Sequence, residues 1–493
     1  MLIFKLIKNK WDILAVIGIF IYVSIFYNIS VPSIYMWDEA VYAGNALEMS
    51  QNDKLLPLYT DGKISEYNVK PPLVIWMQYI AIKFFGINEL SIRLPSVLAG
   101  IMTCCIIGFF GSRNFNFQIG AISILILLTI QGYVNTHVIR SGDLDATMVF
   151  FTTAYLLLFL QDLIRPFHHR KWYFSVLGIL IFLAFLSKSI AGLMPLLGMV
   201  LAVLLFPENR KILREKYLYI SAISVLVLIV SYYFIAEISN PGYFGKVWAS
   251  EFLRLTENVM PWHAQPFWFY AANMVKYNFT PHILILPVIY FAYKSTKIPI
   301  SIFTKNALII VFVFLMLISY PIVKLEWYDA PVYPILALVI SAGIYESLSL
   351  LKIFSLDNRK KFIFYVAALF LTFPLYKIYT LNGRSLPNDP LQYDGYAIRY
   401  LTTNQPDIKN YKVLLYSKHY QHYDQANFYI KASNIEKLTN IKLEHKLAGI
   451  NIGDTVLCSQ SIMLDSLRSK FGLTKINKIH ESYLFKIENV LEN

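Results

Sequence analysis

The sequence predicts a polytopic α-helical membrane protein that ends in a soluble α/β domain. Of its 493 residues, 56% are hydrophobic and only 15% are charged, a composition too apolar for a soluble globular protein. The basic residues gather in short loops between apolar runs of membrane length, which is the pattern of cytoplasmic loops. After about residue 380 the long apolar runs end, and short strand-like and helix-like runs replace them.

The charge and the cysteines exclude several classes of partner. The net charge of +13 does not indicate a nucleic-acid partner, because the bias of basic residues toward cytoplasmic loops accounts for it. Cys104 and Cys105 lie in an apolar run and Cys458 stands alone in the tail, so neither an intrachain disulfide nor a cysteine metal site is expected. We therefore expect membrane lipids, and no nucleic acid, among the partners of the chain.

The apolar runs set the expected topology. The first run, residues 13–27, follows three lysines and has no small-residue cleavage site, so it predicts a retained helix with a cytoplasmic N-terminus. Residues 31–91 then form a long outer loop. Further spans are expected near residues 92–110, from 119, from 146, on both sides of Lys188, and near 217–236, 279–293, 306–322, 330–351 and 362–380. The count is about 11, or about 13 if segments of the outer loops enter the membrane.

The odd count places the end of the chain on the outer face. We therefore divide the chain into a transmembrane domain, residues 1–380, and an extracytoplasmic α/β domain, residues 381–493. In the second domain, strand-like runs lie near residues 412–417, 426–432, 454–460 and 482–489, and a helix-like run lies near 465–471.

An adjacent acid pair, Asp38 and Glu39, follows the first apolar run, and Lys70 stands before Pro71-Pro72 at the start of the next. Ionisable groups at a membrane edge are costly unless they bind, relay or catalyse, so these residues mark a candidate site. The pair could be a proton relay, a set of metal ligands, or a general base with a supporting carboxylate. A helix cap is the alternative role for Asp38.

Three further segments place charged residues on the same expected face. The loop GYVNTHVIRSGDLDA contributes Arg140, Asp143 and Asp145. Lys188 lies between two apolar stretches, where it could either reach the interface by snorkelling or bind a phosphate. The long loop that follows residue 236 holds Glu251, Arg254 and His263 among aromatic residues.

These stretches resemble a known family. WDEAVYAGNALEM and KPPLVIWMQYIAIKFFGINELSIRLPSVLAG resemble the N-terminal signature of the aminoarabinose transferase and protein O-mannosyltransferase family, which consists of membrane glycosyltransferases with the GT-C fold. The family reads there roughly DEARYA, FEKPP, W, FG and RLPS. GDLDATMVFF, LAFLSKSIAGLMP and KLEWYDAPVYPILALV are similar to three later segments of the family, in the same order. The resemblance covers the first ten spans and is most specific in its first signature.

The resemblance implies an inverting glycosyltransferase that uses a polyprenyl-phosphate-linked sugar at the outer face. Asp38 would be the general base that accepts the acceptor's proton, and Glu39 would orient it. The residues expected to bind the donor phosphate are Lys70, Arg254, Lys188 and Arg140. The residues expected to position the acceptor or the sugar are Asp143, Asp145, Glu251 and His263.

The chain departs from the family pattern at three positions. Val69 replaces the glutamate of FEKPP, which removes a plausible metal ligand, although His263 and the acidic clusters leave a divalent cation open. Val41 replaces the arginine after DEA, which weakens any specific expectation of aminoarabinose as the sugar or lipid A as the acceptor. Ser189 replaces the glycine that follows the lysine in the segment similar to LAFLSKSIAGLMP.

A transporter or flippase of lipid-linked glycans is the alternative function. A transporter would place ionisable residues at mid-membrane depth and break its helices there, whereas the acids of this chain stand at the outer edge. The bias toward Ile, Lys, Asn and Tyr indicates a bacterial source, so the expected donor is an undecaprenyl-phosphate sugar in the bacterial inner membrane. The sequence leaves lipid, protein and polysaccharide acceptors open.

Overall fold

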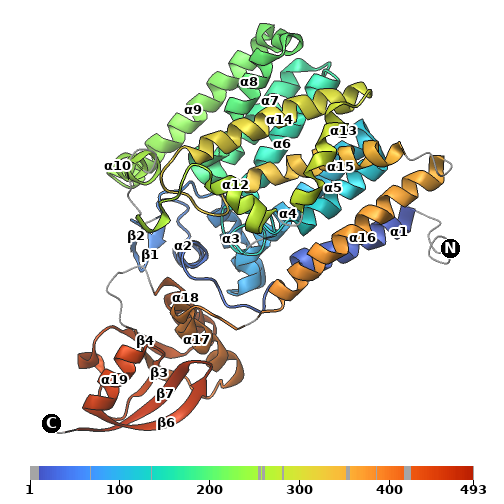
Figure 1. The fold of residues 1–493 in the computed structure, drawn as a ribbon. Helices are drawn as coiled ribbons and strands as arrows, with labels where there is room; N and C mark the ends of the chain where they lie inside the picture. The colour runs from blue at the N-terminus through green and yellow to red at the C-terminus, as the bar shows by residue number, and fades with distance from the viewer. Residues whose placement is uncertain are drawn as a thin grey trace. The chain divides into compact units, whose positions relative to one another are not determined.

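The computed structural model describes residues 10–66, 68–134, 136–253, 257, 261–279, 282–350, 356–384, 386–415 and 423–491 (Figure 1). The chain divides into two compact units. The first unit comprises Met1–Tyr27, Val69–Val74 and Pro95–Asn382, and the second comprises Asn28–Asn68, Ile75–Leu94 and Gly383–Asn493. The second unit therefore joins the C-terminal region to two stretches that the division drawn from the sequence placed in the transmembrane domain.

The first unit is a set of packed helices (Figure 1). Its helices are α1 (Lys10–Ile21), α5 (Phe117–Thr129), α6 (Asp145–Ile164), α7 (Arg170–Lys188), α8 (Pro195–Leu205), α9 (Lys216–Ser239), α10 (Tyr243–Val247), α12 (Phe269–Asn273), α13 (Ile289–Tyr293), α14 (Ile298–Ser319), α15 (Tyr333–Ser349) and α16 (Leu356–Asn382). Two more helices have residues in both units, namely α3 (Leu73–Phe85) and α4 (Glu89–Asn114). In the first unit α7 packs on both α6 and α9, α8 packs on α14, and α5 packs on both α15 and α16.

Seven of the described helical segments are long and apolar enough to cross a membrane. They are Glu89–Asn114, Asp145–Ile164, Arg170–Gly192, Lys216–Ser239, Ile298–Ser319, Ala330–Ser349 and Phe362–Asn382, and four shorter apolar segments are Trp11–Phe26, Leu73–Phe85, Phe117–Thr129 and Pro195–Leu205. In α9 only 6% of the most apolar window is buried, so residues such as Leu226 and Phe234 expose apolar side chains, as lipid-facing positions do. The predicted polytopic helical fold is confirmed, and the span count of 11 to 13 stays a prediction.

The C-terminal part of the second unit is built on a five-stranded sheet in the order β4-β3-β5-β7-β6 (Figure 1). Its strands are β3 (Asn410–Leu414), β4 (Asn440–Glu444), β5 (Thr455–Cys458), β6 (Phe471–Ile479) and β7 (Ser482–Val490). Strand β3 pairs in parallel with β4 and β5, whereas β7 pairs antiparallel with β5 and β6. The helices are α17 (Tyr393–Asn404), α18 (Asp424–Glu436) and α19 (Ser461–Lys470). The predicted α/β domain is therefore confirmed.

One strand prediction in this domain is wrong. Residues 426–432 lie inside helix α18. The prediction failed because the apolar residues of so short a run do not distinguish a strand from a buried helix. Ala426, Tyr429 and Ser433 are buried at the spacing of one helical face.

The segment predicted from the sequence as an outer loop, residues 31–91, supplies most of the rest of the second unit. It contains α2 (Asp38–Asn52) and a short hairpin of β1 (Tyr59–Thr60) and β2 (Lys63–Ile64). Helix α18 packs against α2, and Lys431 on α18 binds Glu48 at 2.5 Å and Asp61 at 2.7 Å. Burial between helices and these ion pairs make the loop and the C-terminal region one body.

Candidate functional site

Asp38 is the first residue of α2. The residue before it, Trp37, has φ 75° and ψ −124°, a conformation that residues with a Cβ rarely adopt and that tends to occur at functional sites. The Asp38 side chain is half-buried, and the positive end of the helix dipole stabilises its negative charge. Within its own unit the described residues give the Asp38 carboxylate no hydrogen bond or ion pair, so it is not committed to a structural partner there.

The neighbouring carboxylate of Glu39 is in a different situation. Glu39 is 1% exposed, and its two oxygens accept from Nε of Arg93 at 2.8 Å and from Nη2 of Arg93 at 3.0 Å. The backbone N–H of Tyr35 donates to it as well, at 2.6 Å. Arg93 also donates to three backbone carbonyls between residues 29 and 33. Glu39 therefore anchors the segment that leads into α2.

In the first unit, Lys70 lies at one end of a chain of contacts. Its Nζ is 2.7 Å from Oε1 of Glu251, whose side chain is 2% exposed. The other oxygen of Glu251 accepts from the Ser189 hydroxyl at 2.8 Å, and that hydroxyl is 3.1 Å from the Tyr233 hydroxyl. The predicted phosphate-binding lysine thus carries a buried carboxylate partner that the sequence had assigned to the acceptor.

Lys188 forms a second lysine–carboxylate pair in this unit. Its Nζ lies 2.5 Å from Oδ2 of Asp145, and the two side chains are 10% and 3% exposed. Lys188 is the last residue of α7 and Asp145 is the first residue of α6, so the pair ties two helix ends together. The ammonium also lies over the ring of Tyr328, 5.3 Å from its centroid.

Asp143 is paired with a histidine that the sequence reasoning did not single out. Nδ1 of His137 is 2.9 Å from Oδ2 of Asp143, and the Ser141 hydroxyl donates to the same oxygen at 3.0 Å. The His137 ring stacks on Trp327 with centroids 3.7 Å apart. His137 lies in an irregular loop, where no periodicity marks which side chains meet, so the sequence held no signal for this contact.

The other predicted residues lie elsewhere. Arg140 is buried and donates to the backbone carbonyls of Ser24, Ile25 and Tyr27, with distances of 2.8 to 3.3 Å, so its guanidinium holds the chain that follows α1. His263 is half-buried in a short turn, Pro261–His263. Arg254 lies outside the described residues. Among the residues that the structure describes, no group of three or more His, Cys, Asp or Glu side chains is arranged to hold a metal ion.

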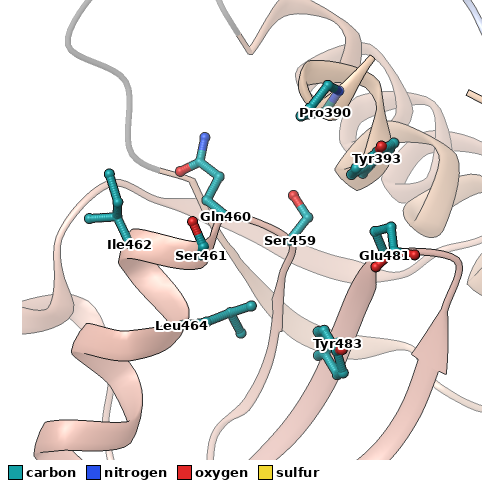
Figure 2. Close-up of a pocket in the computed structure, with 9 residues that line it drawn as sticks. All are labelled: Pro390, Tyr393, Ser459, Gln460, Ser461, Ile462, Leu464, Glu481 and Tyr483. Atoms are coloured by element: carbon teal, nitrogen blue, oxygen red, sulfur yellow. The ribbon is translucent and has the colours of Figure 1, made fainter. Parts of the chain in front are cut away.

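A cavity of about 550 Å³ opens in the C-terminal part of the second unit (Figure 2). Its lining residues are Pro390, Tyr393, Ser459, Gln460, Ser461, Ile462, Leu464, Glu481 and Tyr483. The Ser459 hydroxyl in its wall donates to Oδ2 of the buried Asp394 at 2.7 Å. Burial raises the pKa of Asp394 to about 7, although hydrogen bonds from Ser459 oppose the increase.

Comparisons of sequence give matches over parts of the chain. Residues 69–234 match the model of a family described as dolichyl-phosphate-mannose-protein mannosyltransferase. An uncharacterised protein of Aquifex aeolicus is 27% identical over 334 residues, which are 67% of this chain and 64% of that protein. A putative mannosyltransferase of Bacillus subtilis, YycA, is 30% identical over 149 residues, which are 30% of this chain and 20% of that protein. The chain thus spans less than two thirds of the length of these curated relatives.

Two solved structures have a similar fold. The first is ArnT from Cupriavidus metallidurans bound to undecaprenyl phosphate, with a TM-score of 0.71 and 15% identity, covering 97% of this chain and 98% of that one. The second is the archaeal oligosaccharyltransferase AglB from Archaeoglobus fulgidus in complex with an inhibitory peptide and a dolichol-phosphate, with a TM-score of 0.52 and 12% identity, covering 97% of this chain and 74% of that one. At these identities the likeness shows a common fold.

Proposed function

We propose that the chain, which shares its fold with ArnT and AglB and matches a mannosyltransferase family model over residues 69–234, is a GT-C glycosyltransferase that transfers a sugar from a polyprenyl-phosphate donor to a cell-envelope acceptor, with inversion. The acceptor oxygen forms a bond to the anomeric carbon of the sugar. The bond from that carbon to the phosphate oxygen breaks, and its electron pair leaves with the phosphate. The acceptor's proton passes to a carboxylate of the protein.

The observation that carries the proposal is the contrast between two adjacent acids. Glu39 forms a buried ion pair with Arg93. Asp38, in contrast, is half-buried at the start of α2 and has no hydrogen-bond partner among the described residues of its unit. A general base needs a carboxylate oxygen that can reach the substrate proton. We therefore assign the base to Asp38, and to Glu39 the task of holding the segment that carries it.

The donor phosphate is assigned to Lys70. Its side chain is 24% exposed while that of its partner Glu251 is buried, so part of the lysine side chain is accessible to a ligand. An ammonium at the phosphate stabilises the charge that develops on the leaving group. Lys188 is more buried and is held by Asp145, and we assign this pair, together with Asp143, to positioning the sugar or the acceptor. We assign Arg140 a structural role, because its guanidinium donates to three backbone carbonyls.

Location and substrates complete the proposal. We place the chain in a bacterial inner membrane with the N-terminus cytoplasmic and the reaction on the outer face, as the distribution of basic loops favours. The donor is an undecaprenyl-phosphate sugar, a choice that the undecaprenyl phosphate bound to ArnT supports. The acceptor is a lipid, a protein or a polysaccharide of the envelope.

A transfer assay in membranes tests the function. Polyprenyl-phosphate sugars with labelled sugars are offered to the wild type and to Asp38→Asn, and the label is followed into lipid, protein and polysaccharide fractions. Asp53→Asn is the matched control, because Asp53 follows the other end of α2 and is exposed. Label that moves with the wild type and the control but not with Asp38→Asn supports the proposal. If no label is transferred but labelled lipid crosses the bilayer in a protein-dependent way, the chain is a flippase.

A further inference from the structure

The contact between Ser189 and Glu251 joins two segments that lie 62 residues apart in the chain. Ser189 follows the last residue of α7, and Glu251 lies in the helical turn Trp248–Phe252. The serine hydroxyl donates to one oxygen of the carboxylate, and the lysine ammonium binds the other oxygen. Glu251 therefore bridges a neutral donor and a charged donor, and its position is fixed from both sides.

The backbone of Ser189 is strained where it makes this contact. Its φ of 53° and ψ of −135° lie in a region that glycine adopts freely and that costs conformational energy for a residue with a Cβ. The family that the sequence resembles has glycine at this position. A serine at this position keeps the backbone strain that a glycine would avoid. Its hydroxyl, however, lies 2.8 Å from Oε2 of Glu251.

The burial of Glu251 makes its partners important. A carboxylate that is 2% exposed cannot be left without a cation or a donor, because an uncompensated buried charge is strongly destabilising. An incoming anion therefore gains nothing by displacing Lys70 from Glu251, because displacement would leave the buried carboxylate without its cation. It binds to an ammonium whose place is already set, which lowers the ordering cost that a long lysine side chain would otherwise incur.

Further hydrogen bonds hold the segment that carries Lys70. The hydroxyl of Tyr243 donates to the backbone carbonyl of Val69 at 2.7 Å, and it is 3.0 Å from the hydroxyl of Tyr232. Val69 is therefore held through its backbone next to the lysine. The glutamate that the resembled family has at residue 69 is absent, and the carboxylate beside Lys70 comes from Glu251 instead, 181 residues away in the chain.

We infer that Ser189 and Glu251 are positioning residues for Lys70, which hold its ammonium where the lipid phosphate of the donor binds. This rests on the proposed function, in which Lys70 binds that phosphate. Glu251 then belongs to the donor side of the reaction and not to the acceptor, and Ser189 acts on the donor through Glu251.

Binding of undecaprenyl phosphate to the purified full chain tests the inference without any need for turnover. Ser189→Ala and Ser189→Gly both remove the hydroxyl, but only glycine removes the backbone strain. We expect both variants to bind undecaprenyl phosphate about tenfold more weakly, the loss that follows when a hydrogen bond to a charged group is removed. Donor KM should rise by the same factor while acceptor KM stays unchanged. Ser187→Ala is the control, because the Ser187 hydroxyl donates to Leu183 within its own helix.

The outcomes separate the inference from the function on which it rests. Equal weakening in the two Ser189 variants, with Glu251→Gln at least as weak, supports the positioning role. Wild-type affinity in both Ser189 variants overturns it and leaves the proposed function intact. If the two variants differ in affinity and differ to a matching degree in thermal midpoint, the effect of substituting Ser189 comes from backbone strain and not from the lost hydroxyl. That result would also overturn the inference. A wild type that does not bind undecaprenyl phosphate overturns the proposed function and the inference with it.

Discussion

Arg93 donates to both oxygens of Glu39, from Nε at 2.8 Å and from Nη2 at 3.0 Å, and both side chains are 1% exposed. A buried, bidentate pair of this kind is specific in geometry. The RLPS arginine and the second acid of the DEA motif are therefore one structural element, even though they lie 54 residues apart.

Glu39→Gln should destabilise the protein while leaving Asp38 in place. The substitution removes the charge that compensates Arg93, so we expect the free energy of unfolding to fall by about 3–5 kcal/mol. The thermal midpoint of the purified protein measures this loss. A midpoint equal to that of the wild type would show that the three backbone carbonyls suffice to hold Arg93.

Asp38→Asn, in contrast to Glu39→Gln, should leave the stability almost unchanged and lower the rate of transfer. Among the described residues of its unit the Asp38 carboxylate has no structural partner, so we expect a change in stability of only about 0.3–1 kcal/mol from the lost interaction with the helix dipole. The rate of transfer should fall by roughly 10²–10⁴-fold, the usual contribution of a general base. Steady-state kinetics with a competent donor measure the rate, and a rate within tenfold of the wild type would remove the assignment.

Lys188→Met should destabilise the protein, and a second substitution, Asp145→Asn, should restore the stability but not the activity. Alone it leaves the buried Asp145 carboxylate without its cation and should cost about 3–5 kcal/mol. In Lys188→Met with Asp145→Asn neither member of the pair carries a charge, so most of the loss should be recovered. Thermal midpoints of the single and double variants test the coupling, and additive losses would contradict it.

Asp394→Asn should stabilise the protein at high pH only. Burial raises the pKa of Asp394 to about 7 from an ordinary 3.8, so the folded chain holds this proton more tightly than the unfolded chain does. The protonated form of Asp394 therefore contributes to the free energy of unfolding. This contribution is fully present below about pH 4 and is lost as pH rises through about 7. Asparagine resembles the protonated acid, and we expect a gain of roughly 2–4 kcal/mol at pH 8.

Thermal midpoints of wild type and Asp394→Asn across pH 4 to 8 test this prediction. Both proteins retain Asp424, whose pKa burial also raises to about 7, so the difference between the two curves isolates Asp394. A difference that does not grow with pH would show that the acid is already ionised in the folded chain.

The sequence predicted what depends on local pattern. Apolar length predicted the helices, and alternation with turn residues predicted β3, β5 and β7. Asp38 and Lys70 were found because charges beside membrane-length runs stand out. The short run at residues 426–432 failed because its apolar residues suit a strand or a helix equally.

The partners of the site residues could not be predicted, since they come from distant segments. Glu251 reaches Lys70 across 181 residues and Ser189 reaches Glu251 across 62. The stacking of His137 on Trp327 likewise depends on how two irregular loops come together and not on spacing along the chain. Such contacts decide whether a lysine binds a substrate alone or with a resident carboxylate, and that distinction has no trace in one sequence.

The contacts between residues 28–94 and the C-terminal region within the second unit bear on the design of truncations. Tyr429 receives a hydrogen bond from the backbone N–H of Ile34 at 2.8 Å and donates to Glu89 at 2.7 Å, while Lys431 binds Glu48. A chain cut after α16 would lose these contacts and expose one flank of α2. Loss of activity on deletion would therefore not identify the tail as a substrate-binding module, because the tail is the scaffold on which the helix beginning at Asp38 is built.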